Sequence, residues 1–478
     1  MQHLNADIVI IGAGSGGLSL AAGAAQMGAR VVLFEGSEMG GDCLNTGCVP
    51  SKALLAVGKA AHNACSKAHF GIHVTDTKID FAAAKDYVDT VIARIAPHDS
   101  VARFTSLGVT VISEYARFKT DRIVVSDNYE VNAKYIVIAT GSTAFMPPIP
   151  GLDKVSYHTN ETIFADHDKP DHLVIIGGGP IGIEMAQAHC RLGVNVTVVE
   201  ALTVMGRDDQ ELVSILKNQL IDEGVTFIEE TSVTNIDQKI DPSNQHRTLI
   251  TLQLSDGQTL MASHLLVAAG RRPSMDRLDL DLAGINHDRR GIITDKRLRT
   301  SIKHIFAIGD VTGRQQFTHI AGYHAGIVLR NILFKLPAKI DDSTIPWVTY
   351  CDPELAHVGL THAEAITNYG ADNISILSTS LSDNDRAIAE SRTEGMVKII
   401  THKKGRILGA SILAPAAGEM ILAWALAISA KQKISAMAKV ITPYPTYGDA
   451  SKRAAGSFFT EKLFSPRMRK AVQFLLKF

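Results

Sequence analysis

Unbroken apolar runs that end in a glycine-rich turn occur twice along the chain. Residues 8–17 read IVIIGAGSGG and residues 173–182 read LVIIGGGPIG. Each is followed by a helix-like stretch and then by a second apolar run that ends in glutamate, Glu35 or Glu200. Continuous Val and Ile runs are typical of strands buried on both faces of a parallel sheet. The pattern therefore predicts two doubly wound, Rossmann-like α/β lobes.

Later apolar runs indicate how these lobes close and where they end. Residues 135–141 (YIVIATG) and 265–270 (LLVAAG) are expected to be closing strands, and the proline-rich residues 147–151 form a joint. After residue 342, strand-like and helix-like runs alternate without a phosphate-type loop, which predicts an α+β domain. We expect five segments with the boundaries 1–150, 151–270, 271–342, 343–460 and 461–478.

Composition excludes several classes of protein. The 478 residues are 46% hydrophobic and 20% charged, with a net charge of −1, which argues against a globally basic nucleic-acid binder. Five cysteines are too few, and an odd number, for a secreted disulfide scaffold. The N-terminus shows no secretory signal, and the longest apolar stretch, residues 420–428, is too short to span a bilayer. We expect a cytoplasmic enzyme.

The glycine spacing indicates two dinucleotide sites. The first glycine of such a motif allows the tight turn, the second lets the backbone approach a pyrophosphate, and the third lets the helix pack on the strand. A carboxylate at the end of the second strand binds a ribose hydroxyl. Glycines used only for turns are the alternative, which the matched repetition makes improbable. The predicted sets are Gly12, Gly14, Gly17 and Glu35, and Gly177, Gly179, Gly182 and Glu200.

The acid of the second site indicates which nicotinamide nucleotide is used. A carboxylate at Glu200 would bind a free 2′-hydroxyl and repel a 2′-phosphate, which favours NADH over NADPH. Arg207, the nearest following cation, could instead fold back onto a phosphate.

A cysteine pair lies in the stretch GGDCLNTGCVPSK, residues 40–52. Four residues separate Cys43 from Cys48, and a helix is expected from about Pro50. A helix N-terminus lowers a thiol pKa, and such a pair can cycle between disulfide and dithiol. Zinc is the alternative, but a structural zinc site needs four ligands. His62 and Cys65, the nearest candidates, have the pattern of ordinary helix residues.

This stretch resembles the redox-active segment GG-x-C-x4-C-x-P-S-K of the flavoprotein disulfide reductases, which include dihydrolipoamide dehydrogenase, glutathione reductase and mercuric reductase. The resemblance covers nearly the whole chain. It includes Ile308-Gly309-Asp310, which is similar to the family's second flavin motif, and Gly418-Glu419-Met420 in the dimerisation domain.

The resemblance implies a role for each segment. Residues 1–150 and 271–342 would bind FAD, residues 151–270 would bind NAD(P), and residues 343–460 would form a homodimer that completes the active site. Cys48 would face the flavin as the charge-transfer thiol, Cys43 would meet the acceptor, and Lys52 would lie near the flavin, paired with Glu184. The remaining cofactor-binding positions implied are Gly41, Ala116, Thr140, Gly141, Gly270, Gly309 and Asp310, the last on the ribityl chain.

One segment departs from the disulfide-exchanging members, which use a His held by a Glu as the base. Here Tyr444 occupies the His position and Asp449 the Glu position. Tyrosine, with a pKa near ~10, is a poor base at neutral pH but can donate a hydrogen bond or weakly ligate a soft metal. Packing at the dimer interface is the alternative for Tyr444. Mercuric reductase is similar in carrying Tyr here, but the Cys pair at its C-terminus is not found in this chain.

The tail after Phe459 is predicted to be a basic amphipathic helix. Met468, Val472 and Leu475 fall on one face, and residues 461–478 carry five basic residues and one acidic residue. Docking on its own domain or on the partner subunit is expected, and weak binding to a membrane surface is the alternative.

The sequence therefore predicts an FAD enzyme that passes electrons from NADH through Cys43 and Cys48 to a small thiophilic or electron-accepting substrate, as in mercuric reductase. The alternatives are a dihydrolipoamide dehydrogenase and, in another class, a flavin-binding redox sensor or membrane-recruited accessory protein. No nucleic-acid partner and no resident metal are expected.

Overall fold

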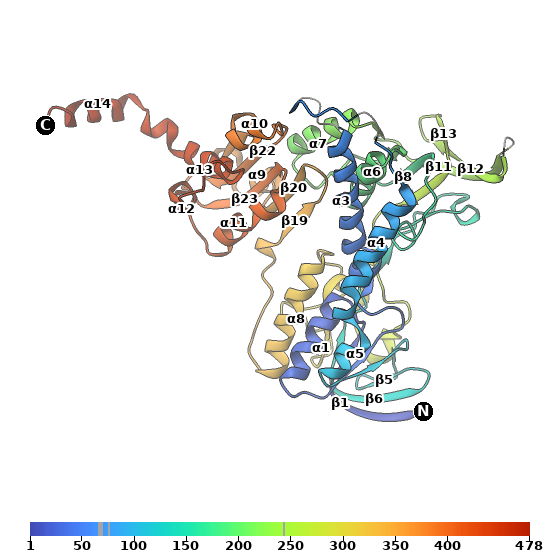
Figure 1. The fold of residues 1–478 in the computed structure, drawn as a ribbon. Coiled ribbons are helices and arrows are strands. Elements are labelled where there is room, and N and C mark those ends of the chain that lie inside the picture. The colour runs from blue at the N-terminus through green and yellow to red at the C-terminus, as the bar shows by residue number, and fades with distance from the viewer. Residues whose placement is uncertain (66–69, 75–76, 242–243) are drawn as a thin grey trace. The chain divides into compact units, whose positions relative to one another are not determined.

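The computed structural model describes residues 1–65, 70–74, 77–241 and 244–478 and contains two compact units (Figure 1). Unit 1 comprises residues 1–178, 188–201 and 231–340, and unit 2 comprises residues 179–187, 202–230 and 341–478. The expected division into five segments at the boundaries given above stays a prediction.

A seven-stranded sheet forms the centre of unit 1. Its parallel strands are β1 (Gln2–Ile11), β2 (Val31–Phe34), β3 (Val109–Ile112), β6 (Tyr129–Ile138) and β18 (Ile305–Ala307). The antiparallel strands β4 (Arg117–Phe118) and β5 (Ile123–Val125) extend it beyond β6. The predicted buried strand at residues 8–11 is confirmed, since Ile8, Val9, Ile10 and Ile11 are buried.

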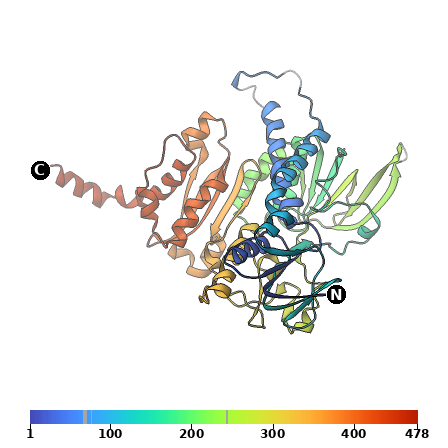
Figure 2. The same cartoon turned by 60° about the horizontal axis from the view of Figure 1, so that its bottom comes forward.

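Helices α1 (Ser15–Gln26) and α8 (Thr318–Leu333) lie side by side on this sheet (Figures 1 and 2). Their apolar side chains share one core with strands β1 and β2, in which Leu20 and Val328 are fully buried. The other helices of this part are α2 (Gly41–Asn45), α3 (Cys48–Cys65), α4 (Phe81–Ile95) and α5 (Val101–Ser106), with α3 packed along α4.

The second lobe repeats the strand–turn–helix–strand order. Strands β8 (His172–Ile176), β9 (Asn195–Val199) and β14 (His264–Val267) run parallel, and α6 (Pro180–Arg191) follows β8. An antiparallel sheet of β11 (Val233–Asp241), β12 (Asn244–Leu254) and β13 (Thr259–Ala262) lies between β9 and β14 in sequence. The short pairs are β7 (Ser142–Ala144) with β15 (Arg271–Pro273), and β16 (His287–Asp288) with β17 (Gly291–Ile292).

Unit 2 contains the predicted α+β domain. Its antiparallel sheet has the order β19 (Pro346–Thr349), β20 (Glu354–Gly359), β23 (Ile407–Ala414), β22 (Met396–His402) and β21 (Ile374–Ser380). The fully buried Trp424 anchors α11 in the core of this domain. The helices are α9 (His362–Tyr369), α10 (Asp385–Ala389), α11 (Ala417–Ser429), α12 (Ile434–Lys439) and α13 (Gly448–Leu463), and α7 (Gln210–Asp222) and β10 (Val225–Ile228) also belong to this unit.

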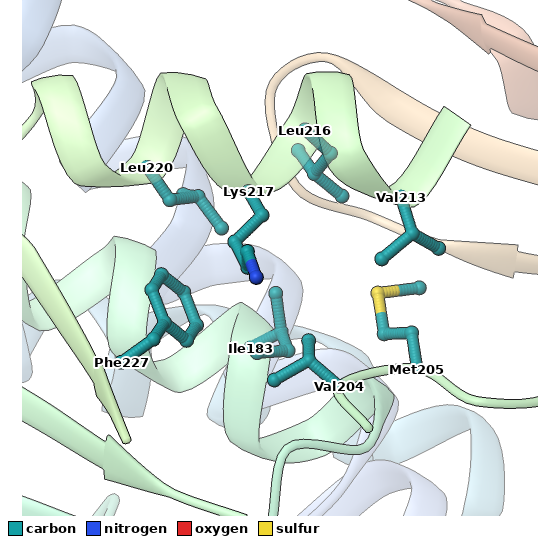
Figure 3. A pocket seen from close by; sticks show the side chains of 8 residues that line it. All are labelled: Ile183, Val204, Met205, Val213, Leu216, Lys217, Leu220 and Phe227. Atoms are coloured by element: carbon teal, nitrogen blue, oxygen red, sulfur yellow. The ribbon is translucent and has the colours of Figure 1, made fainter. Parts of the chain in front are cut away.

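Figure 3 shows side chains of α6, α7, β10 and the loop before α7 that point toward one another within unit 2. All are apolar except Lys217, whose ammonium forms an ion pair with Glu229. Because Ile183, Leu216 and their neighbours fill the space between these elements, we interpret this region as core packing and not as a ligand site.

The predicted amphipathic tail is confirmed as a helix, α14 (Pro466–Leu475), which extends away from the rest of unit 2 (Figures 1 and 2). Docking on its own domain is wrong for this chain, because every side chain from Arg467 to Phe478 is exposed. Within the described ranges, each helix is too short or too polar to cross a membrane.

Candidate active site

The first glycine-rich loop is shaped by close approaches of backbone to backbone. Gly12 has a φ of +106°, and a Cβ at this position would lie 2.4 Å from the carbonyl oxygen of Ala139. A Cβ at Gly17 would lie 1.9 Å from the carbonyl oxygen of Gly12. The turn and the contact between helix and strand therefore both require glycine.

The second loop has the same geometry. Gly177 has a φ of +115°, and its Cβ would lie 2.4 Å from the carbonyl oxygen of Ala268. Glu35 accepts a hydrogen bond of 2.7 Å from the backbone N–H of Ala13, and Glu200 accepts one of 2.7 Å from Gly178. Each glutamate thus contacts the residue that follows the first glycine, so the sequence repeat is also a structural repeat.

The middle glycine of each loop faces open space, since a Cβ at Gly14 or Gly179 would contact nothing within 4 Å. Gly14 is also the N-cap of α1. Among the described residues, no side chain caps this helix, and its first turn contains no acidic residue. An uncapped helix start with an open backbone approach fits a pyrophosphate. The residues present therefore fit a dinucleotide such as FAD at the first loop.

The cysteine segment packs directly on this first loop. The N–H of Gly40 donates to the carbonyl oxygen of Ala13, and a Cβ at Gly41 would lie 2.8 Å from the Cα of Gly14. Gly41 begins α2, which carries Cys43, and Cys48 is the first residue of α3. The expectation of a helix from about Pro50 is corrected to Cys48.

No disulfide joins Cys43, which is half-buried, to Cys48, which is exposed. Cys48 Sγ lies 3.3 Å from Thr318 Oγ1 at the start of α8. The pKa of Cys43 is raised, chiefly by its hydrogen bond with Cys48 and then by burial, although the hydroxyls of Thr318 and Ser15 act in the opposite direction. The expected lowering of the pKa is therefore wrong for Cys43, because the neighbouring sulfur and burial outweigh any effect of the helix start.

A polar network, which the sequence did not reveal, joins the cysteine segment to the second flavin motif. Arg271 lies 2.8 Å from a carboxylate oxygen of Asp42, the neighbour of Cys43, and donates to the hydroxyl and carbonyl oxygens of Ser142. Ser142 in turn donates a hydrogen bond of 2.6 Å to Asp310, whose pKa is raised by burial. Asn160 completes the network with a hydrogen bond of 2.8 Å to Asp42. These partners are far apart in sequence, so local motifs gave no signal of them.

The other predicted cofactor positions lie in loops around this sheet. Gly309 has a positive φ and donates its N–H to Nδ1 of His324, while Thr140 donates to the carbonyl oxygen of Ser274. The remaining ones are the buried Ala116 between β3 and β4, and the positive-φ glycines Gly141 after β6 and Gly270 after β14.

The predicted pair of Lys52 and Glu184 is divided between the units. Lys52 lies on α3 of unit 1, with Nζ 3.3 Å from Ser51 Oγ. Glu184 lies on α6 in unit 2, is buried, and accepts a hydrogen bond from the backbone N–H of Tyr350. Their pairing stays a prediction.

Tyr444 and Asp449 have partners other than each other. The hydroxyl of Tyr444 donates a hydrogen bond of 2.7 Å to Asp385, which raises the Tyr444 pKa. Asp449 accepts one of 2.6 Å from Arg453. Tyr444 is 71% exposed in the single chain. A tyrosine with a raised pKa keeps its proton, so it is a hydrogen-bond donor and not a base. Asp385 was missed because it lies 59 residues before Tyr444.

Comparisons with known proteins agree with this arrangement. Residues 6–325 match the pyridine nucleotide-disulphide oxidoreductase family, and residues 345–455 match the dimerisation domain of that family. The mercuric reductase of Streptomyces lividans is 34% identical over 96% of this chain and 97% of its own length. The dihydrolipoyl dehydrogenase of Geobacillus stearothermophilus is 32% identical over 95% of this chain and 96% of its own.

A solved structure of a flavoprotein disulfide reductase has a similar fold. The Cu(II) complex of the HOCl-induced flavoprotein disulfide reductase RclA from Escherichia coli superposes with a TM-score of 0.83. It is 29% identical in sequence and covers 93% of this chain and 98% of its own. The predicted fold class is therefore confirmed, together with a family in which FAD and a pyridine nucleotide are the cofactors. The chain belongs to the pyridine nucleotide-disulphide oxidoreductases and is an enzyme of the mercuric reductase and dihydrolipoamide dehydrogenase type.

Proposed function

We propose that this enzyme uses NADH to reduce a thiophilic metal ion, such as Hg(II) or Cu(II), at Cys43 and Cys48. The observation that carries the proposal is the thiol pair itself, packed against the glycine-rich loop at Gly14, together with a proton-retaining Tyr444 where lipoamide-type members need a base. The similarity to mercuric reductases and to a protein solved as a Cu(II) complex supports the choice of substrate class.

We propose a role for each candidate site residue of unit 1. Gly12, Gly14, Gly17 and Glu35 would hold FAD, with Asp310 on its ribityl chain and Lys52 nearby. Bound FAD would supply two-electron transfer between NADH and the cysteines. Cys48, at the start of α3, would face the cofactor, and Cys43 would meet the substrate. Arg271 and Asn160 would fix the short helix α2, which carries Cys43, by holding Asp42.

The chemistry balances as two separate exchanges. NADH and a proton reduce the Cys43–Cys48 disulfide to two thiols, and NAD⁺ leaves. The two thiols then bind the metal ion through sulfur and release their protons. With Cu(II), each sulfur would give one electron to one of two Cu(II) ions, and the disulfide would form again. Hg(II), which thiolates bind without reducing, would stay on the two sulfurs and would take its two electrons from a second NADH. On substrate binding, the exposed hydroxyl of Tyr444 from the partner subunit of a homodimer would exchange its hydrogen bond to Asp385 for one to the substrate.

The second loop would take NADH in preference to NADPH. Glu200 is fixed by the N–H of Gly178, in the position that Glu35 has in the first loop. A carboxylate there favours a free 2′-hydroxyl. Glu200→Gln is expected to lower the ratio of kcat/KM for NADH over NADPH, and an unchanged ratio would contradict this assignment.

Steady-state NADH oxidation with different acceptors tests the proposal. We expect turnover with Hg(II) or Cu(II) in the presence of a small thiol, loss of that turnover in Cys43→Ser, and slow turnover with lipoamide. Tyr444→His combined with Asp449→Glu should raise the lipoamide rate, because it supplies a base with a pKa near neutrality. Fast lipoamide turnover by the unmodified enzyme would favour the alternative, a dihydrolipoamide dehydrogenase.

A further inference from the structure

Two histidines and one aspartate converge in unit 1, apart from the cysteine pair. Nε2 of His158 lies 3.1 Å from Oδ2 of Asp166, and Nε2 of His264 lies 3.5 Å from the same oxygen. The two imidazole rings are stacked, with centroids 5.9 Å apart. The three ligand atoms lie within 4.8 Å of one another, and all three side chains are about one-fifth exposed.

Backbone hydrogen bonds hold His158 beside the strand that carries His264. His264 is the first residue of β14, and His158 forms a parallel bridge with Leu266 of that strand. The N–H of His158 donates to Leu265, and its carbonyl oxygen accepts from Val267. The rings therefore project from adjacent, hydrogen-bonded segments.

The atoms of the three side chains that face away from the cluster form hydrogen bonds, as the corresponding atoms of metal ligands do in proteins. Nδ1 of His158 lies 3.3 Å from the hydroxyl of Thr162, and Nδ1 of His264 lies 3.0 Å from the hydroxyl of Ser263. Oδ1 of Asp166 accepts a hydrogen bond of 3.0 Å from the N–H of Asp168. Such outer contacts fix ring orientation and leave the opposite nitrogen or oxygen for the ion.

The spacing suits a transition-metal ion. Four-coordinate zinc with bonds of about 2.0–2.2 Å places its ligand atoms roughly 3.3–3.5 Å apart. The two observed separations from Asp166, 3.1 and 3.5 Å, lie close to that range. Two imidazoles and one carboxylate form a donor set that zinc and similar ions use, with the remaining position taken by water.

Charged side chains of both signs lie near the cluster. Lys85 on α4 opposes a cation, and the carboxylates of Asp166 and Asp89 attract its ammonium. The ammonium of Lys85 also donates to the carbonyl oxygen of Ile163.

We propose that His158, Asp166 and His264 bind one divalent transition-metal ion of the Zn(II) class, at a site separate from Cys43 and Cys48. The ion would tie the segment from His158 to Asp166 to the start of β14, the strand that leads to Gly270 and Arg271.

Equilibrium dialysis of the FAD-loaded enzyme against Zn(II) tests the site. Because thiols also bind zinc, the measurement uses the Cys43→Ser/Cys48→Ser variant throughout. We expect one equivalent of Zn(II) per chain and its loss in His158→Ala/His264→Ala. Asp166→Asn, which preserves shape and removes only the charge, should weaken binding at least tenfold without loss of FAD. Co(II) in place of Zn(II) should give visible d–d bands without a thiolate band.

The neighbouring cluster of Asp86, Asp89 and His167 provides the matched control. His167→Ala should leave Zn(II) binding unchanged. Absence of zinc binding in the cysteine variant, or loss of binding that follows His167 and not His158 and His264, would overturn the proposal. Either result would leave the proposed electron transfer through Cys43 and Cys48 untouched.

Discussion

The hydroxyl of Thr318 contacts the exposed thiol of Cys48 and also affects the pKa of Cys43. Its Oγ1 lies 3.3 Å from Cys48 Sγ, and it lowers the pKa of Cys43 against the larger effects of Cys48 and burial. Thr318 lies 270 residues after Cys48 in the sequence, so no local motif links it to the cysteines. Such a partner is brought into place by the sheet and by α8, and no local pattern encodes it.

Thr318→Val should slow the metal-dependent reaction about fivefold at neutral pH, since the loss of one hydrogen bond of about 1 kcal/mol makes the Cys43 thiolate harder to form. Thr318→Ser keeps the hydroxyl and should remain near the unmodified rate. The pH profile of kcat/KM should move to higher pH in Thr318→Val only, and a profile shared by all three proteins would contradict this role.

His324 carries a stability effect that depends on pH. It is fully buried on α8, and burial lowers its pKa from the ordinary 6.5 to about 4. Below pH 6.5 the unfolded chain binds a proton that the folded chain does not, so stability falls as the pH drops toward 4. The cost is about 2 kcal/mol at about pH 5.

His324→Gln, which can still accept the hydrogen bond from Gly309, should lose less stability between about pH 7.5 and about pH 5. The comparison is the urea midpoint of the FAD-loaded enzyme at the two pH values. Equal losses in both proteins would exclude His324 as the titrating group.

At the scale of elements, the two strand–turn–helix units were predictable because their signals are local. Apolar runs gave the strands, and glycine spacing gave the turns before α1 and α6. The positions of Glu35 and Glu200 gave the ends of β2 and β9. The polar network from Asp42 through Arg271 to Asp310 was not predictable, because its members come from separate elements that only the assembled sheet brings together.

Gly12→Ala and Gly177→Ala should separate the two dinucleotide sites. Each added Cβ would lie 2.4 Å from a backbone oxygen at a positive φ. The first variant should lose FAD on purification, whereas the second should retain FAD and raise the KM for NADH more than tenfold. Gly28→Ala is the control, since Gly28 also has a positive φ but a Cβ there would contact nothing within 4 Å. FAD content comparable in all three variants would contradict the assignment of the first loop.

At the scale of the whole molecule, the exposed helix α14 raises the question of what covers its apolar side chains. Val472, Leu475 and Phe478 are all exposed in the single chain. The amphipathic pattern predicted the helix correctly. It does not identify the surface that buries the apolar face, because a partner subunit and a membrane would both bind a helix of this pattern.

A chain that ends at Ser465 should keep its FAD, its thermal midpoint and its rate of NADH oxidation, because α14 buries no side chain in the rest of this chain. Light scattering of the two forms tests whether the helix contributes to the dimer. Liposome sedimentation tests the membrane alternative, which equal pelleting of the two forms would remove.

Anaerobic titration of the oxidised, FAD-loaded enzyme with NADH shows whether electrons from NADH reach the Cys43–Cys48 pair. The unmodified enzyme should take up one hydride equivalent for the flavin and one for the disulfide, a two-electron couple of its own. Cys43→Ser should take up the flavin equivalent alone. If the unmodified enzyme and Cys43→Ser consume the same amount of NADH, the pair does not accept electrons and the proposed electron path is wrong.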